Sequence, residues 1–350
     1  MVETSLAALF ILLLLLMFIL MSLFLYLMVN KVQNNKMRAR IEDLKEENRL
    51  AVFQYLQTGD KASIETDLTD EKIKALFELL NEYTNVLDGV EVKERIHTFT
   101  KEYLTTFVQR QLKQRRWSLR MNALYSIEDF QMNHLTPVLH ELYQKKRVTS
   151  GEKAQILKLF AQFNEPMIID YLEEVGTDIS DFSLLTILLH LDDEKVDELV
   201  EGFSNVPKRL QYMLVDAIGE KQLTAYHSLL QKLVISQDTE LRVRALKAYA
   251  NSGIPIDAEV LGEFFDSEIW PIRMMAAKVT GVQRLDMYKE QLVDLLSDQE
   301  YVVRAEAAKA ILRFKDGEEV LESVVDESTD IFAKDMAIEW LEKERGAYSY

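Results

Sequence analysis

Apolar residues recur at three- and four-residue spacings along most of this chain, from about residue 70 to residue 345. The stretch YVVRAEAAKAI, residues 301–311, is typical: small and aliphatic side chains share one face, and polar side chains occupy the other. Gly (11 residues) and Pro (5) are scarce, and helix-favouring residues dominate. The pattern predicts an all-α protein made of many short helices.

The helical pattern repeats with a period near thirty residues. A basic residue returns at intervals of 31, 31 and 30 positions: Arg242, Arg273, Arg304 and Lys334. Three positions after each of them stands an alanine: Ala245, Ala276, Ala307 and Ala337. Six positions before each stands a small polar residue: Ser236, Ser267, Asp298 and Ser328. A period of this length indicates a solenoid of stacked helical pairs.

Packing explains why these residue types recur. An alanine on the inner face of a helix lets the next helix approach closely, and the basic residue near the helix start can reach polar groups in the preceding turn. Arg120, with Ala123 three positions later, shows the same arrangement upstream. We therefore expect a helical solenoid over residues 70–345, with its clearest repeats at 223–345, and a frayed tail at 346–350.

These segments resemble the inner-helix signature of the HEAT-repeat family, in its short-period bacterial form that also occurs in phycobilisome-lyase-like repeats. The match is carried by LRVRALKA, IRMMAAKV and VVRAEAAKAI, and it weakens over residues 97–222. Only Asp298 keeps the aspartate that the family often places six residues before the arginine, so no regular Asp–Arg ladder is expected. The resemblance implies an α-α superhelix that binds proteins along its concave face.

The first thirty residues follow a different pattern. From Thr4 to Asn30 no side chain is charged, and residues 5–29 are long enough to cross a bilayer as one helix. Basic residues follow this stretch and none precedes it, which predicts a cytoplasmic C-terminal domain and an outside N-terminus. The residues that set this topology are Lys31, Lys36, Arg38 and Arg40. A cleaved signal peptide fits less well, because the start is not basic and the apolar run is too long.

Residues 31–69 are predicted to form a juxtamembrane helix and a linker. Opposite charges alternate along 38–60, while apolar residues recur only briefly, at Ile41, Leu44 and Val52. We interpret this helix as a solvated stalk, with a short coiled-coil dimer as the alternative. Thr69 or Asp70 can cap the helix that follows.

The sequence offers little for catalysis. It contains no Cys, and its five His include a single His-Glu dipeptide, at 140–141, so no metal ligand set is expected. No phosphate-binding or dinucleotide-binding glycine motif is present. Two kinds of enzyme stay open as alternatives within the fold: a lyase-like enzyme and a metal-dependent enzyme.

Charge is distributed unevenly along the chain. The net charge is −17, which argues against a nucleic-acid-binding groove. A basic cluster near the anchor is a candidate contact for anionic lipid or for a partner: Arg110, Lys113, Arg115 and Arg116. Trp117 beside it is expected in the core, with a place at the interface as the alternative. Residues 316–345 carry eleven acidic and three basic residues.

Trp270 and Pro271 open an inner helix, where solenoids display binding residues. The pair is a possible partner contact, although the pattern favours core packing between repeats.

Together these features predict a non-enzymatic, membrane-anchored cytoplasmic scaffold or adaptor without a cofactor. Its expected partners are a protein on the concave face and the bilayer around residues 5–29. Besides the enzyme, a second alternative is an extracytoplasmic binding module with the anchor reversed.

Overall fold

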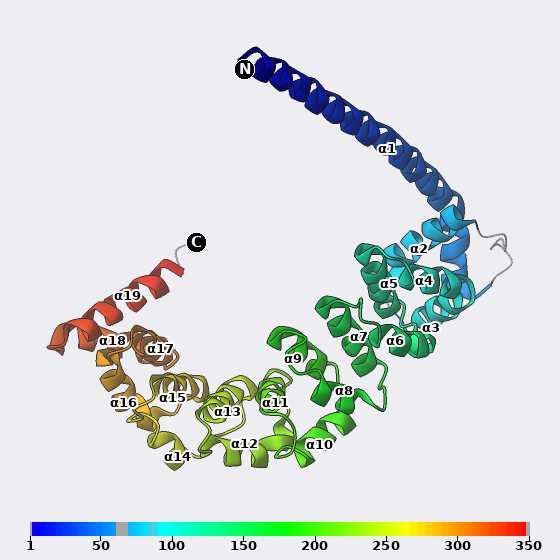
Figure 1. Ribbon diagram of the computed structural model, residues 1–350. Helices are drawn as coiled ribbons and strands as arrows, with labels where there is room; N and C mark the ends of the chain where they lie inside the picture. The colour runs from blue at the N-terminus through cyan, green and yellow to red at the C-terminus, as the bar shows by residue number, and fades with distance from the viewer. Residues whose placement is uncertain (1, 61–68, 85, 88, 348–350) are drawn as a thin grey trace. The chain divides into compact units, whose positions relative to one another are not determined.

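The computed structural model describes residues 2–60, 69–84, 86–87 and 89–347, and all regular elements in these ranges are helical (Figure 1). They build a HEAT-like α-solenoid preceded by one long apolar helix. The chain divides into two compact units, an N-terminal unit of residues 1–156 and a C-terminal unit of residues 157–350.

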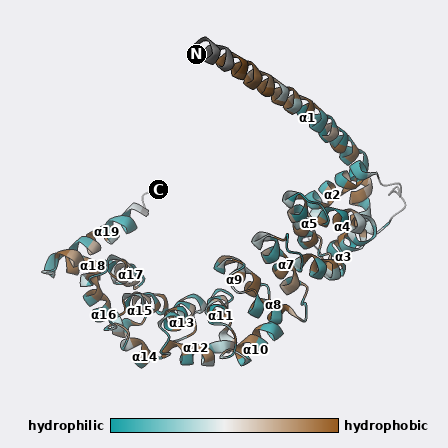
Figure 2. Ribbon diagram, viewed as in Figure 1, coloured by the Kyte–Doolittle hydropathy of each residue, from teal (hydrophilic) through white to brown (hydrophobic). Residues whose placement is uncertain are grey.

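Helix α1 runs without interruption over Val2–Thr58, a length of 57 residues. Its apolar side chains from Leu9 to Val29 are exposed, and Figure 2 shows this part as a brown ribbon that turns teal further along the helix. The segment is the single candidate membrane span among the described residues, by length and composition.

The C-terminal part of α1, from residue 38 onward, is not the solvated stalk that we expected. Ile41, Leu44, Val52, Tyr55 and Leu56 are buried. They pack against α2 (Asp70–Thr84) and α3 (Val90–Phe99). The brief apolar seam in the sequence is therefore covered from within the chain, so it needs no second copy.

Ion pairs and hydrogen bonds fix α2 parallel to α1. Arg38 pairs with Glu78 at 2.6 Å, and Lys45 pairs with Glu82 at the same distance. At the end of this contact the Tyr83 hydroxyl donates to the Arg49 carbonyl at 3.0 Å. Residue numbers thus rise in the same direction along both helices, which places the start of α2 closest to the apolar part of α1.

The rest of the N-terminal unit consists of short helices. Helix α3 continues through a π-helical turn into α4 and then packs through α4 on α5. The elements after α3 are η1 (Thr100–Leu104), α4 (Thr105–Leu112), α5 (Trp117–Asp129), η2 (Asn133–Leu135), α6 (Thr136–Tyr143) and α7 (Ser150–Gln162). The boundary between the two units falls within α7.

The C-terminal unit repeats one helical pair six times. Its outer helices are α8 (Ile168–Glu174), α10 (Asp193–Glu201), α12 (His227–Val234), α14 (Ala258–Gly262), α16 (Lys289–Asp294) and α18 (Gly317–Glu327). Its inner helices are α9 (Asp181–Leu189), α11 (Lys208–Glu220), α13 (Thr239–Ser252), α15 (Trp270–Gln283), α17 (Tyr301–Ile311) and α19 (Ile331–Ala347). Short 3₁₀ turns complete the pairs: η3 (Thr224–Tyr226), η4 (Asp286–Tyr288) and η5 (Leu295–Ser297). Each inner helix packs on the next, and within this unit the inner helices line the inside of the arc in Figure 1.

Small residues set the distance between neighbouring inner helices. The four repeat alanines have no exposed surface: Ala245, Ala276, Ala307 and Ala337. Two glycines permit a still closer approach. A Cβ atom on Gly219 of α11 would lie 2.8 Å from the Ala248 Cα of α13, and one on Gly281 of α15 would lie 2.6 Å from the Ala310 Cα of α17. The seam therefore admits no larger side chain without a shift of the backbone.

Candidate protein-binding surface

The repeat arginines hold the turns that lead into the inner helices. The Arg273 guanidinium donates to the Ser267 carbonyl at 2.6 Å, six residues upstream. Arg304 reaches the Asp298 carbonyl at the same distance, and Arg120 reaches the carbonyls five and six residues upstream at 2.8 and 3.0 Å. These bonds satisfy backbone groups that precede a helix start, and so they fix the position of the first helical turn.

Two of these arginines also pair with a carboxylate of the following repeat. Arg273 binds Asp298 through two hydrogen bonds of 2.6 and 2.9 Å. Burial acts to raise the pKa of Asp298, but the hydrogen bonds from Arg273 and the Glu300 amide, together with the charges of Arg273 and Arg304, outweigh it and leave that pKa lowered. Arg120 pairs with Glu152 in the same bidentate way, at 2.6 and 3.1 Å.

The other basic positions of the series have no such carboxylate. Arg304 lies with its guanidinium carbon 4.8 Å from the centre of the Phe332 ring, a cation–π contact with the next repeat. Arg242 contacts the Thr239 hydroxyl at 3.5 Å and leaves its buried Nε without a partner. Lys334 is half-buried, and its side chain makes no ion pair with any residue that the structure describes.

The first turns of the last three inner helices expose large apolar side chains. Trp270 begins α15, Tyr301 and Val302 begin α17, and Ile331 and Phe332 begin α19. Their exposed fractions are 40%, 51%, 42%, 72% and 59%, in that order. We call these five residues the aromatic surface. A set of exposed aromatic and aliphatic side chains at equivalent places in neighbouring repeats is typical of a protein-binding site.

Acidic residues border the aromatic surface. Glu268 and Glu300 are exposed just before α15 and α17, and Asp330 precedes α19. The carboxylates of Glu268 and Glu300 make no hydrogen bond or ion pair with a described residue. A cavity of about 450 Å³ opens there, lined by Glu268, Trp270, Arg273, Ser297, Asp298, Gln299 and Glu300. Since Arg273 is already paired with Asp298, a basic group of a partner would be favoured at this rim.

The two repeats directly before these three lack these features. Lys208 and Thr239 begin α11 and α13, in place of an aromatic residue. Lys208 pairs with Asp238 at 3.0 Å, and Arg209 pairs with Asp181 at 2.7 Å. The charges at these helix starts are thus neutralised within the chain, which sets the last three repeats apart as a surface.

Sequence reasoning identified one member of this surface and missed four. Trp270 is only partly buried, and Pro271 follows it in the first turn of α15, where proline is tolerated. The signal for the others was present in the period, because Tyr301 and Ile331 stand three residues before Arg304 and Lys334, just as Trp270 precedes Arg273. Trp117 occupies the corresponding place in α5, and the prediction that it lies in the core was wrong: it is 52% exposed.

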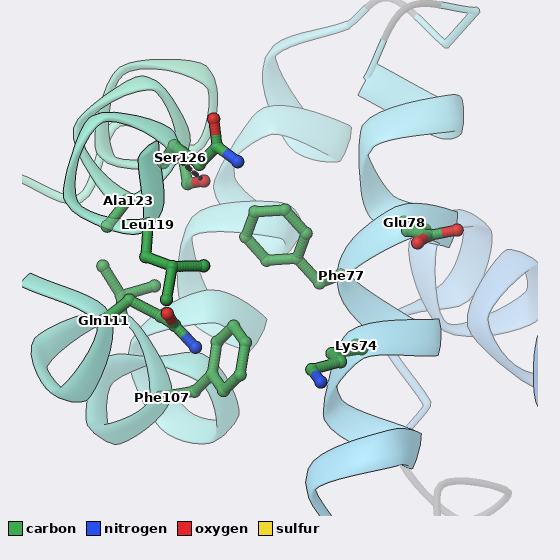
Figure 3. A pocket seen from close by; sticks show the side chains of 10 residues that line it. Lys74, Phe77, Glu78, Phe107, Gln111, Leu119, Ala123 and Ser126 are labelled. Atoms are coloured by element: carbon green, nitrogen blue, oxygen red, sulfur yellow. Dashed lines mark hydrogen bonds between the residues drawn. The ribbon is translucent and has the colours of Figure 1, made fainter. Parts of the chain in front are cut away.

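A smaller apolar pocket lies in the N-terminal unit between α2, α4 and α5 (Figure 3). Its volume is about 210 Å³, and Phe77, Phe107 and Leu119 supply its apolar walls. Lys74 and Glu78 stand on one side of the opening, and Glu78 is held by its ion pair with Arg38. The pocket could take an aliphatic side chain, but it presents no cluster of groups suited to catalysis.

Two histidines lie together in the N-terminal unit. The rings of His97 and His134 are 6.0 Å apart, and His134 Nε2 is 2.8 Å from the Thr105 hydroxyl. Burial, with a smaller effect of nearby His97, lowers the pKa of His134. Throughout the described ranges, no three His, Asp or Glu side chains are grouped as metal ligands.

Comparisons with known proteins give likeness of structure without likeness of sequence. No protein-family model matches the chain, and no curated protein sequence matches it. Similar solved structures include human deoxyhypusine hydroxylase in complex with glycerol, at 16% identity and a TM-score of 0.30, covering 71% of this chain and 99% of that one. UNC-45 from Drosophila melanogaster matches at 11% identity and a TM-score of 0.35 over 85% of this chain, and the match spans 54% of UNC-45. An engineered protein matches at 18% identity and a TM-score of 0.27, covering 69% of this chain and 96% of its own length.

Proposed function

We propose that this protein is a membrane-anchored scaffold without catalytic activity, whose C-terminal repeats bind a partner protein on the cytoplasmic side. The observation that carries the proposal is the aromatic surface. Five large apolar side chains are exposed to between 40% and 72% at equivalent places in three adjacent repeats, where a partner could cover them.

The anchor gives the scaffold its location. The apolar side chains from Leu9 to Val29 find no cover within the described chain, and a bilayer would provide it. Exposed basic residues follow this stretch, which favours a cytoplasmic position for everything after it. A bacterial inner membrane fits the short repeat period of the HEAT-like solenoid.

The partner is expected to be a membrane-bound or membrane-proximal protein with a basic, apolar segment. Glu268 and Glu300 would attract its basic groups, while Trp270, Tyr301 and Phe332 would bury its apolar side chains. Aromatic residues dominate the binding energy of most interfaces, and bordering charges mainly raise the association rate and specificity.

Affinity capture from gently solubilised native membranes tests this proposal. The full chain, tagged at its C-terminus, would be compared with the triple variant Trp270→Ala, Tyr301→Ala, Phe332→Ala. Phe182→Ala is the matched control, because Phe182 is an aromatic residue in the first turn of α9 that is 80% exposed but lies outside the aromatic surface. We expect one specific partner with the wild type and the control, and its loss with the triple variant. Equal recovery with all three proteins would overturn the assignment of the surface.

A further inference from the structure

The loop between α4 and α5 lies beside the loop between α6 and α7, and each loop carries a cluster of basic residues. Arg147 donates through its guanidinium to the Lys113 carbonyl at 3.3 Å, so the cluster at 145–147 lies beside the cluster at 113–116. We call the six exposed side chains the basic patch: Lys113, Arg115, Arg116, Lys145, Lys146 and Arg147. None of them forms an ion pair with a described residue. Trp117, half exposed, follows directly after Arg116.

Contacts within the N-terminal unit show the position of the α4–α5 loop along the axis of α1. The Lys74 ammonium lies 3.9 Å from the Met37 sulfur, and α2 runs parallel to α1, so Asp70 is one helical turn nearer to the apolar span than Lys74. Asp70 therefore lies level with about residue 33 of α1. That is only about four residues, or roughly 6 Å, from the end of the span at Val29.

Helix α4 points toward the same level. Its Phe107 ring lies 6.2 Å from the ring of Phe77 in the middle of α2, whereas Arg110, further along α4, pairs with Asp70 at 2.6 Å. The chain thus advances toward the apolar span along α4, and the loop of residues 113–116 continues beyond Arg110. The polar layer of a bilayer is roughly 5–8 Å thick on each side, so the loop reaches the depth of the lipid headgroups.

We propose that the basic patch binds the headgroups of anionic lipids, with Trp117 at the membrane interface, and so holds the N-terminal unit against the bilayer. The inference rests on the membrane anchoring proposed above. Charge complementarity selects the occupant: six basic side chains, none in an ion pair with a described residue, would face a membrane surface that carries negative charge. Tryptophan is enriched at that depth, because its ring is amphipathic.

Trp117 is itself the probe for a test on the full chain. The chain contains two other tryptophans, Trp270 and Trp340, which would be replaced by phenylalanine. The protein would be inserted into nanodiscs of phosphatidylcholine, with or without phosphatidylglycerol, in which the acyl chains carry bromine close to the headgroup. We expect quenching of Trp117 fluorescence in the anionic discs, little quenching in the neutral discs, and loss of quenching when salt is raised.

Matched charge variants separate the patch from a general effect of charge. Lys113→Gln, Arg115→Gln, Arg116→Gln should abolish the quenching, whereas Lys232→Gln, Lys315→Gln, Lys334→Gln removes as many charges in the C-terminal unit and should leave it unchanged. If the chain stays in the discs but the quenching is absent, or is equal in both lipids, the inference about the basic patch is overturned and the proposed anchoring is not. A chain that fails to stay in the discs would overturn the proposed anchoring as well.

Discussion

The Arg120–Glu152 pair is the residue-scale feature with the clearest consequence for stability. The two side chains are 3% and 0% exposed, and Glu152 also accepts hydrogen bonds from the backbone amide and hydroxyl of Thr149. Thr149 and Glu152 form a capping box at the start of α7, since the Glu152 amide lies 3.4 Å from the Thr149 hydroxyl. One carboxylate thus caps α7 and joins it to α5.

Removing one partner of this pair should destabilise the N-terminal unit strongly. We expect Glu152→Leu or Arg120→Met to cost about 3–5 kcal/mol, because each leaves a buried charge without compensation, and the double variant to cost less. Hydrogen exchange of peptides from α5 and α7 would measure the local opening. The exposed pair Arg38–Glu78 provides the comparison, and Arg38→Met should cost no more than about 1 kcal/mol. A double variant as unstable as the two single changes combined would contradict this account of the pair.

The same pair predicts a loss of stability in acid. Burial acts to raise the pKa of Glu152, but the hydrogen bonds from Arg120 and Thr149 outweigh it, so the pKa is lowered in the folded state. The stabilisation is therefore complete above the ordinary pKa of about 4.3 and disappears as the pH falls through the lower, folded value. Thermal unfolding of the full chain in detergent between neutral pH and pH 3 would measure it. The double variant Arg120→Met, Glu152→Leu should show a shallower decline, and an identical decline would refute the assignment.

At the scale of single elements, the period allowed the inner helices of the last repeats to be located from the sequence. Arg273, Arg304 and the alanines that follow them lie where the spacing placed them, because the same packing problem recurs in each repeat. The interpretation of residues 38–60 was wrong because its partner helices, α2 and α3, are tertiary neighbours. A charged helix with a short apolar seam has the same sequence pattern whether that seam faces water, a second copy or another helix of its own chain.

The exposure of Trp117 escaped prediction for a similar reason. A tryptophan in a helical repeat is usually needed for the core, and only the structure shows that Arg120, three residues later, turns inward instead. The repeat period could not predict the pairing of Arg120 with Glu152 either, because Glu152 does not stand at the repeat position that is equivalent to Asp298.

The close packing between inner helices leads to a second prediction, which concerns the contact of α15 with α17. Gly281→Ala should destabilise the contact of α15 with α17 by about 1–3 kcal/mol, because the new methyl group would overlap with Ala310. Gly151→Ala is the control, since a Cβ on Gly151 of α7 meets no atom within 4 Å, and helix propensity then favours alanine. Urea unfolding followed by circular dichroism would compare them. A Gly281→Ala protein as stable as the wild type would show that this seam is loosely packed.

At the scale of the whole molecule, the anchor makes a prediction about sidedness. The natural chain has no cysteine, so one introduced residue reports its own location without background. Ser267→Cys in the full chain should resist a membrane-impermeant maleimide in intact spheroplasts and react after the membrane is opened. Reaction in intact spheroplasts would reverse the topology and favour a binding module outside the cytoplasm.

The central claim, that the aromatic surface binds a partner at the membrane, is tested most directly by site-specific photocrosslinking in intact membranes. A benzophenone amino acid would be introduced at Tyr301 in one full-length protein and at Phe182 in another, both exposed aromatic positions at inner-helix starts. We predict one discrete crosslinked product from position 301, containing a second protein, and none from position 182. No product from position 301, or the same products from both positions, would contradict the claim.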